Sequence, residues 1–511
     1  MRRARRFREA LGDPERAQAG TLARILRLAA GSPYGRSCGI TADLGYDAFA
    51  RCVPVVGFEE LRPWIDCEAT TGAPGLSSEP ALVFERTSGS SGRPKLVPYT
   101  QSLLESFNAC FVIWAHDVLR HGPRLRSGRM FWGVSPALEA GGRTPHGTPI
   151  SLADDAGYLA PRYQRLLAPL LVAPAGLKHI ADGEAYRRAL AAVLVAESGL
   201  EVMSVWSPTY LLSILDTIRQ RRGEIVADLR SGRTGPGGEV ELAAAAPARA
   251  ALLADATVRW DRLWPDLKLL SCWTDAAAAT FVPALREAFP RAVIQGKGLL
   301  ATEAAITVPL FDAPGPVPLV DEVFLEFESA QGVVSRLHEL DEGADYGVIL
   351  SQTGGFLRYR LGDRVQVTGR VGRTPCLRFR GRAGCSSDLA GEKLDEAFAR
   401  AVLTAELGPD GHCSYLAPIV ANGSAPGLPG YACITDHPAG DFDPEGLSRR
   451  LDAALSRSFQ YRQARHLGQL NRLRVQFRAD ARAAYEAGEL KRGLRWGNIK
   501  FAALVTASTG E

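Results

Sequence analysis

Residues 81–95, ALVFERTSGSSGRPK, join a short apolar run to a loop that is rich in small hydroxyl residues and glycine. The run 81–86 predicts a β-strand, and a helical pattern follows the loop over about 102–119. Backbone N–H groups in such a loop are free to bind an anion such as a phosphate. The spacing differs from the G-x-x-x-x-G-K-S/T pattern, which disfavours a P-loop NTPase. An ordinary surface turn is the alternative interpretation.

Strand-like and helical patterns alternate downstream of this loop, which is typical of an α/β sheet. The strand-like runs span 130–134, 202–206, 267–272 and 292–295, and the clearest helical patterns span 186–197 and 281–288. The chain before residue 81 predicts helices. Short strand patterns at 322–327 and 347–351 recur without helices between them, which indicates a smaller β-rich portion.

The pattern changes again after residues 379–384. A loop is followed by a predicted helix over 392–403, a strand near 415–420 and a helix over 444–459. We therefore place a domain boundary near residues 380–388.

The charge balance is close to neutral, with 60 Lys and Arg against 56 Asp and Glu and a net charge of +4 over 511 residues. So small an excess disfavours a nucleic-acid-binding surface, which clusters basic charge. The most apolar stretch, 166–177, contains two prolines and is too short to span a membrane. The nine cysteines are scattered without a C-x-x-C pair, which predicts reduced thiols and a cytoplasmic protein.

A second motif, QGKGLLATE at 295–303, follows a strand-like run and formally matches G-x-G-x-x-A. A dinucleotide-binding fold is therefore considered, although only about ten residues separate the motif from Pro309, too few for a crossover helix. Glu303 is the other focus, because a carboxylate at the end of an α/β strand can hold Mg²⁺. The alternative is a solvated carboxylate at a helix start.

A third motif, GFLRYRLGD at 355–363, predicts an alternating strand that ends in a Gly-Asp turn. Such a turn would present the carboxylate of Asp363 to a hydroxylated ligand, and a ribose diol suits that acceptor. An ordinary strand with a charged face is the alternative.

Together, these motifs resemble the Gretchen Hagen three family of acyl-acid amido synthetases, a branch of the adenylate-forming superfamily. Five motifs occur in family order, namely TSGSSGRPKLVPYT, CWTDA, QGKGLLATE, YGVILSQTGGFLRYRLGDRVQVTG and FRGRAGCSSDLAGEKL. The upstream SPYGRSCGI and CVPVVGFEELRPWI and the late GLRWGNIK extend the similarity over nearly the whole chain.

The resemblance implies an α/β fold in which residues 1–382 form a large N-terminal domain with mixed sheets and flanking helices. Residues 383–511 would form a smaller, mobile α+β cap. The implied chemistry has two steps and uses ATP and Mg²⁺. A small-molecule carboxylic acid is activated as an acyl-adenylate, and an amino acid or another amine then displaces AMP.

The resemblance also assigns site residues. Ser88, Gly89, Ser90 and Ser91 would grip the phosphates, with Lys95 nearby as a catalytic residue. Gly298 would lie against the nucleotide, and Thr302 and Glu303 would form the nucleotide and Mg²⁺ motif. Asp363 would bind the ribose, and Arg382 would lie at the hinge between the domains. Lys500, or alternatively Lys491, would be the C-terminal lysine that approaches the nucleotide.

Three alternatives stay open at this point. An acyl-CoA ligase would share the adenylation step and differ only in its nucleophile. A dinucleotide-dependent oxidoreductase would rest on Gly296, Gly298 and Ala301 alone. The presence of Lys95, Glu303 and Asp363 disfavours a non-catalytic binding protein.

Overall fold

The computed structural model describes most of the chain. The described residues are 2–86, 95–133, 142–152, 155–172, 176–180, 182–244, 246–255, 257–382, 386–387, 389, 392, 394–408, 412–419, 429–438, 440, 443–466, 470–491, 494 and 496–505.

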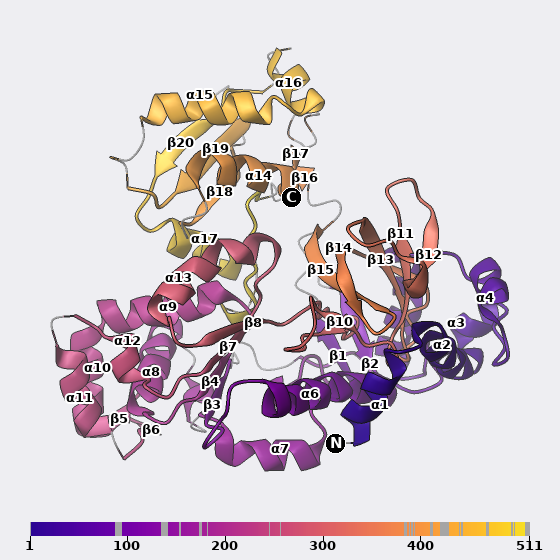
Figure 1. Cartoon of the computed structure of the whole chain (residues 1–511), viewed down its shortest axis with the longest axis horizontal. Coiled ribbons are helices and arrows are strands. Elements are labelled where there is room, and N and C mark those ends of the chain that lie inside the picture. Colours follow the sequence, from indigo (N-terminus) through magenta and orange to yellow (C-terminus); the bar gives the residue numbers. More distant parts are fainter. Residues whose placement is uncertain are drawn as a thin grey trace. The chain divides into compact units, whose positions relative to one another are not determined.

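The chain forms two compact units (Figure 1). The first contains Met1–Trp206, Leu211–Trp273 and Arg291–Phe379, and the second contains Ser207–Tyr210, Thr274–Pro290 and Arg380–Glu511. The second unit thus includes two short segments from the middle of the chain. A division into independently moving domains, 1–382 and 383–511, stays a prediction.

The chain begins with helices, as the sequence predicts. They are α1 (Arg2–Ala10), α2 (Pro14–Ala30), α3 (Pro33–Ser37), α4 (Tyr46–Cys52) and α5 (Phe58–Thr71). Helix α2 starts where the side chain of Asp13 accepts a hydrogen bond from the backbone of Arg16, with Pro14 in the first turn. Leu22, Ile25 and Leu26 on one face of α2 are buried in the core of the first unit.

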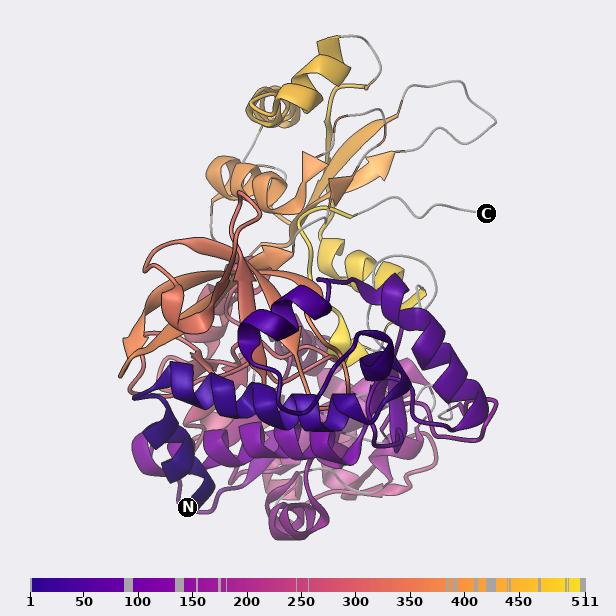
Figure 2. The same cartoon turned by 90° about the vertical axis from the view of Figure 1, so that its right-hand side faces the viewer.

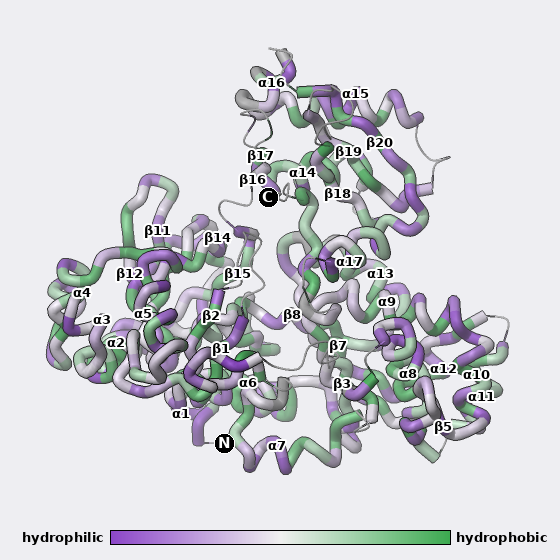
Figure 3. The backbone as a smooth tube through the Cα atoms, turned by 180° about the vertical axis from the view of Figure 1, so that it is seen from behind, coloured by the Kyte–Doolittle hydropathy of each residue, from purple (hydrophilic) through white to green (hydrophobic). Residues whose placement is uncertain are grey.

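A four-stranded parallel sheet forms the α/β part of the first unit. Its strands lie in the order β3 (Met130–Trp132), β4 (Val202–Ser204), β7 (Leu269–Cys272) and β8 (Val293–Gly296). These strands overlap the four predicted runs, with ends that differ by one or two residues, and carry mostly hydrophobic residues (Figure 3). The intervening helices include α8 (Gly183–Ala196), α9 (Pro208–Gln220), α10 (Arg222–Ser231), α11 (Ala246–Ala254) and α12 (Trp260–Leu263), and α13 (Val282–Ala288) precedes β8. The carboxyl ends of parallel strands meet at one edge of the sheet, where ligands commonly bind.

The strands on either side of the first motif, β1 (Val83–Arg86) and β2 (Leu96–Tyr99), form an antiparallel pair. Helix α6 (Gln101–His121) follows β2 and begins where the Thr100 hydroxyl accepts a hydrogen bond from the backbone of Leu103. The predicted strand and helix around the loop are therefore confirmed.

A five-stranded antiparallel sheet is the β-rich portion of the first unit. Its order is β12 (Val334–Arg336), β11 (Phe324–Glu328), β13 (Asp345–Ser351), β14 (Tyr359–Val371) and β15 (Thr374–Arg382). The prediction that a strand ends at a Gly-Asp turn is wrong, because β14 continues through Gly362 and Asp363. Leu361, Gly362 and Asp363 instead lie opposite Val348 alone, as a bulge in which Gly362 has a φ of 85°.

The C-terminal part of the second unit is a small α+β fold, coloured orange to yellow in Figure 2. Strands β18 (Ser414–Ile419) and β19 (Gly430–Thr435) are antiparallel, and β20 (Arg474–Phe477) joins β19 in parallel. The remaining elements are β16 (Ser386–Ser387), β17 (Leu394–Asp395), α14 (Glu396–Leu407), α15 (Pro444–Leu455), α16 (Phe459–His466) and α17 (Ala481–Lys491). Among the helices of the described residues, none has the length and apolar character needed to cross a membrane.

One buried ion pair fastens helix α4 to the antiparallel sheet. The guanidinium of Arg358 bonds both carboxylate oxygens of Glu326 in β11, at 2.9 to 3.2 Å. It also donates to the carbonyls of Ala50 and Val53, at 2.8 and 2.9 Å. Arg358 and Glu326 are 7% and 1% exposed. Breaking such a pair leaves an uncompensated buried charge, which is strongly destabilising.

We expect Arg358→Met to lower the free energy of unfolding by about 3–5 kcal/mol, because Glu326 would stay buried without its partner. The matched control is Arg360→Met, which removes an ion pair between β14 and Glu328 of β11, two residues further along both segments. Because that pair is partly exposed to solvent, its loss should cost at most about 1 kcal/mol. Urea unfolding followed by tryptophan fluorescence measures both, and equal losses would contradict a special role for Arg358.

Candidate functional site

The second motif forms a hairpin. After β8, Gly298 has a φ of 72°, and the backbone N–H of Leu299 donates to the hydroxyl of Thr307 at 2.7 Å. Leu300 and Ala305 form an antiparallel bridge, and strand β9 (Thr307–Val308) follows. We call this segment the 297–308 hairpin. It places Thr302 and Glu303 at its tip.

The hairpin overturns two of the alternatives left open by the sequence. A dinucleotide fold needs a helix whose N-terminus binds the pyrophosphate, and residues 297–308, all of them described, form no helix. The oxidoreductase hypothesis based on Gly296, Gly298 and Ala301 is therefore wrong. The interpretation of Glu303 as a solvated helix-start carboxylate is also wrong, because Glu303 is 5% exposed.

Three residues from other elements hold the tip of the hairpin. The hydroxyl of Tyr359 in β14 donates to Glu303 Oε1 at 3.2 Å, and the side-chain amide of Gln352 donates to the carbonyl of Glu303 at 3.2 Å. The hydroxyl of Tyr99 in β2 donates to the carbonyl of Thr302 at 2.6 Å. Burial raises the pKa of Tyr99 well above its ordinary value, and the charges of nearby acidic groups, Glu303 among them, add to this. Tyr99 therefore keeps its proton and stays a donor.

Asp363 lies four residues beyond Tyr359 on the same strand. Its side chain is 6% exposed, and it occupies the β14 bulge opposite Val348. Bulges often re-aim a side chain next to an active site. Strand β14 thus carries both the residue that holds Glu303 and the predicted ribose acceptor.

Lys95 immediately precedes β2, four residues before Tyr99. It is half-buried, and its ammonium lies 5.2 Å from the centre of the Phe58 ring. Strand β2 thus connects Lys95, which precedes it, to Tyr99, whose hydroxyl binds the carbonyl of Thr302. The predicted phosphate-binding residues Ser88, Gly89, Ser90 and Ser91 lie outside the described residues.

The other two predicted residues belong to the second unit. Arg382 is exposed at the end of β15. Lys500 has an exposed side chain, and its carbonyl accepts a hydrogen bond from the hydroxyl of Tyr485 in α17 at 3.0 Å. Lys491, the alternative to Lys500, is exposed at the end of α17. Their roles stay predictions.

A buried carboxylate at a strand-connecting hairpin fits a hard cation that takes oxygen ligands. The role of Glu303 as a Mg²⁺ ligand is compatible with this position and stays a prediction. Asp117, His121 and Asp312 also bring three ligand atoms within 4.8 Å of one another. Arg8 occupies that cluster, because it bonds Asp117 at 2.5 Å and Asp312 at 2.8 Å.

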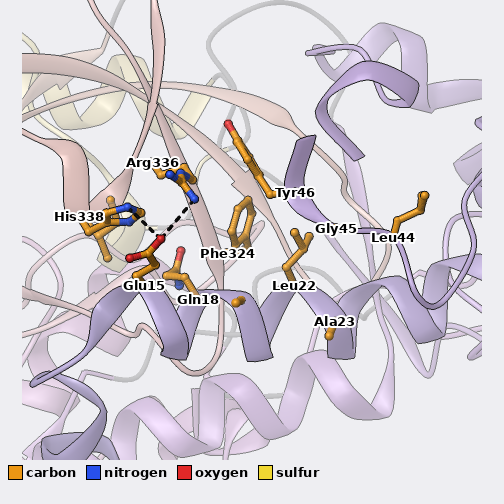
Figure 4. A pocket seen from close by; sticks show the side chains of 12 residues that line it. Glu15, Gln18, Leu22, Ala23, Leu44, Gly45, Tyr46, Phe324, Arg336 and His338 are labelled. Carbon is orange, nitrogen blue, oxygen red and sulfur yellow. Dashed lines mark ion pairs between the residues drawn. The ribbon is translucent and has the colours of Figure 1, made fainter. Parts of the chain in front are cut away.

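A separate pocket of about 160 Å³ lies between α2 and the edge of the antiparallel sheet (Figure 4). Its charged groups pair with one another, since Glu15 lies 3.6 Å from both Arg336 and His338. None of the predicted site residues lines it.

Sequence reasoning missed Tyr99, Gln352 and Tyr359. Tyr99 and Tyr359 stand in quoted motifs, and each is a buried, hydroxyl-bearing aromatic on a strand. A buried tyrosine needs a hydrogen-bond partner, and this is the signal that could have singled them out.

Comparisons with known proteins point to one family. Residues 3–294 match the GH3 family N-terminal domain, and residues 317–382 match the GH3 family central domain. The chain is 25% identical over 407 residues to the putative indole-3-acetic acid-amido synthetase GH3.10 of Oryza sativa subsp. japonica, covering 77% of this chain and 83% of the relative. It is 24% identical over 416 residues to the indole-3-acetic acid-amido synthetase GH3.8 of Oryza sativa subsp. indica, covering 74% and 68%.

Solved structures share the fold. The AtGH3.15 acyl acid amido synthetase in complex with 2,4-DB matches with a TM-score of 0.82 at 20% identity, over 99% of this chain and 94% of that one. A 2-hydroxyisobutyryl-CoA ligase matches with a TM-score of 0.53 at 14% identity, over 91% and 86%. The predicted fold class, a large α/β N-terminal part with a smaller α+β C-terminal part, is confirmed.

We expect Gly298→Ala to destabilise the 297–308 hairpin. A Cβ there would lie 2.5 Å from the Thr307 hydroxyl, which accepts the bond from Leu299. The matched control is Gly39→Ala, where φ is 68° and no atom lies within 4 Å of the added Cβ. The control should cost about 1 kcal/mol from its backbone conformation, and Gly298→Ala about 1–3 kcal/mol more from the clash. Urea unfolding measures the difference, and equal losses would contradict the close contact.

Proposed function

Since the chain belongs to the GH3 family, we propose that it is an ATP-dependent acid–amino acid ligase that forms carbon–nitrogen bonds. It activates a carboxylic acid as an acyl-adenylate and transfers the acyl group to an amine, most simply that of an amino acid. The observation that carries this proposal is the buried carboxylate of Glu303, held at the hairpin tip by Tyr359 on the strand that also carries Asp363. The curated relatives, which are named amido synthetases, support it.

In the first step, a carboxylate oxygen of the acid forms a bond to the α-phosphorus of ATP. The bond from that phosphorus to the bridging oxygen breaks, and pyrophosphate leaves with the electron pair. Charge develops on phosphoryl oxygens, so fixed positive groups and N–H donors stabilise the transition state. Lys95 and the loop 87–94 would supply these groups. Mg²⁺, held by Glu303, would supply further positive charge to the phosphates.

Asp363 orients the nucleotide in this proposal. Its carboxylate would accept hydrogen bonds from the ribose hydroxyls and fix the α-phosphate relative to the acid. The buried bulge favours this role, since a carboxylate removed from bulk water makes stronger hydrogen bonds.

In the second step, the nitrogen lone pair of a neutral amine attacks the acyl carbon. The bond from that carbon to the phosphate oxygen breaks, AMP leaves, and the amine proton passes to solvent. AMP is a good leaving group, so alignment matters more than acid–base catalysis. Lys500 and Arg382 belong to the second unit. We assign Lys500 to the approach towards the nucleotide and Arg382 to the hinge.

The eight cysteines that the structure describes are free thiols, which supports a cytoplasmic setting.

The products test the proposal. With ATP, Mg²⁺, a panel of carboxylic acids and amino acids, we expect pyrophosphate and AMP to be released and amides to be detected by mass spectrometry. Hydroxylamine should trap the acyl group as a hydroxamate. ADP as the only nucleotide product would refute the proposal. A coenzyme A thioester that forms faster than any amide would make the protein an acyl-CoA ligase instead.

Glu303→Gln and Asp363→Asn test the site assignments. Each should reduce kcat/KM for ATP by about 100-fold or more, a loss of about 3 kcal/mol in transition-state stabilisation. Both changes keep the size of the side chain, so the circular dichroism spectrum should not change. The control is Glu328→Gln, a partly exposed carboxylate on β11 whose partner is Arg360. Unchanged turnover in Glu303→Gln and Asp363→Asn would overturn their roles.

A further inference from the structure

A row of side chains crosses the parallel sheet on one face. Trp132, Ser204, Ser271 and Gln295 are register partners on β3, β4, β7 and β8, so their side chains point the same way. The indole N–H of Trp114 in α6 donates to Gln295 Oε1 at 2.9 Å, which identifies this face as the one that contacts α6. Within the described part of the chain, Ser271 Oγ and Gln295 Nε2 are buried and make no hydrogen bond.

Lys297 lies over this row, one residue beyond β8 and 8% exposed. Its ammonium donates to Ser204 Oγ at 2.8 Å and lies 5.0 Å from the ring centre of Trp206 and 6.0 Å from that of Trp114. The cluster therefore combines a buried cation, two indole rings and two further hydrogen-bond donors. Such a set of groups suits an anionic, aromatic ligand.

Two buried thiols near Lys297 carry no negative charge of their own. Burial raises the pKa of Cys110 and of Cys272 to about 12, and the charge of Lys297 lowers each only in part. Both thiols therefore stay neutral at pH 7.

Helix α6 connects this cluster to the hairpin tip. Phe107, Phe111 and Trp114 are buried and spaced for one helix face. The ring of Phe107 lies 5.4 Å from that of Tyr99, whose hydroxyl binds Thr302. Trp114, at the other end of the face, lies against Lys297. The rings of this face also contact Tyr158 and Trp132. Seven helical residues span about 10 Å, which is close to the length of one aromatic ring with a hydrogen-bonding group at each end.

Resting on the proposed function, we propose that Lys297 selects the acyl acid and that this acid is an aromatic dicarboxylic acid. The reacting carboxylate would lie at the Glu303 end of the α6 face. The second carboxylate, on the opposite side of the ring, would bind Lys297, Ser271 and Gln295 while the ring contacts the indoles of Trp114 and Trp206. A site whose buried donors bind a substrate group rejects analogues that lack it.

Steady-state kinetics with terephthalate and benzoate tests this inference, because the two acids differ only in the second carboxylate. Wild-type protein should favour terephthalate in kcat/KM by about 100-fold, and Lys297→Met should abolish most of that preference through KM for the acid. Ser271→Ala should weaken it less. The matched control, Lys268→Met, removes the lysine next to the amino end of β7, which pairs with Glu201, and should leave the preference unchanged.

Several results would overturn the inference. One is a wild-type preference in kcat/KM for benzoate or 4-hydroxybenzoate over terephthalate. Another is a terephthalate-to-benzoate ratio that does not change in Lys297→Met. An equal loss of kcat/KM for both acids in that variant would indicate a purely structural role for Lys297. Binding is followed separately by tryptophan fluorescence, since Trp114 and Trp206 lie against Lys297. Terephthalate binding that depends on Lys297 without AMP release from any acid would refute the proposed function and keep this site. No terephthalate binding would refute the site.

Discussion

The buried guanidinium of Arg358 is the constraint on which the position of the hairpin tip depends. Arg358 has a φ of 46°, which costs a non-glycine residue about 1–2 kcal/mol. Its ion pair with Glu326 and its bonds to the end of α4 offset that cost. Val56 then pairs with Tyr359, the next residue, so the Tyr359 ring starts β14 in a fixed place. The hydroxyl that holds Glu303 is positioned by this scaffold and not by a flexible loop.

The local sequence of the 297–308 hairpin does not determine its structure. The pattern G-x-G-x-x-A fits both a turn into a helix and a turn into a second strand. The contact that separates them is the bond from Leu299 to the Thr307 hydroxyl, and Gly298 is needed because a Cβ would meet that hydroxyl. The short distance between the motif and Pro309 correctly disfavoured a dinucleotide fold, because too few residues were available for a crossover helix.

Much of the fold was nevertheless legible from the sequence. The strands β3, β4, β7 and β8 are short apolar runs between helical patterns, and buried parallel strands have that composition. The β14 bulge was not predictable, because its register depends on the pairing with β13 and on the left-handed Gly362. The partners of the hairpin tip were hidden for the same reason, since Tyr99 reaches Thr302, and Tyr359 reaches Glu303, from positions far away in the sequence. Lys297 was quoted within a motif, but only its burial against Trp114 and Trp206 distinguishes it from a surface lysine.

The two buried charges of the hairpin have opposite signs, and this arrangement constrains what can lie along α6. Glu303 at the tip favours a cation and the phosphates that accompany it, whereas Lys297 at the base favours an anion. Because one short, internally bonded hairpin carries both, their separation cannot change much without loss of the Thr307 bond. A ligand that satisfies both ends must therefore have a fixed length, and a rigid aromatic ring meets that condition with less loss of conformational entropy than an alkyl chain. In the proposed enzyme, the geometry that positions the nucleotide therefore also limits the length of the acid.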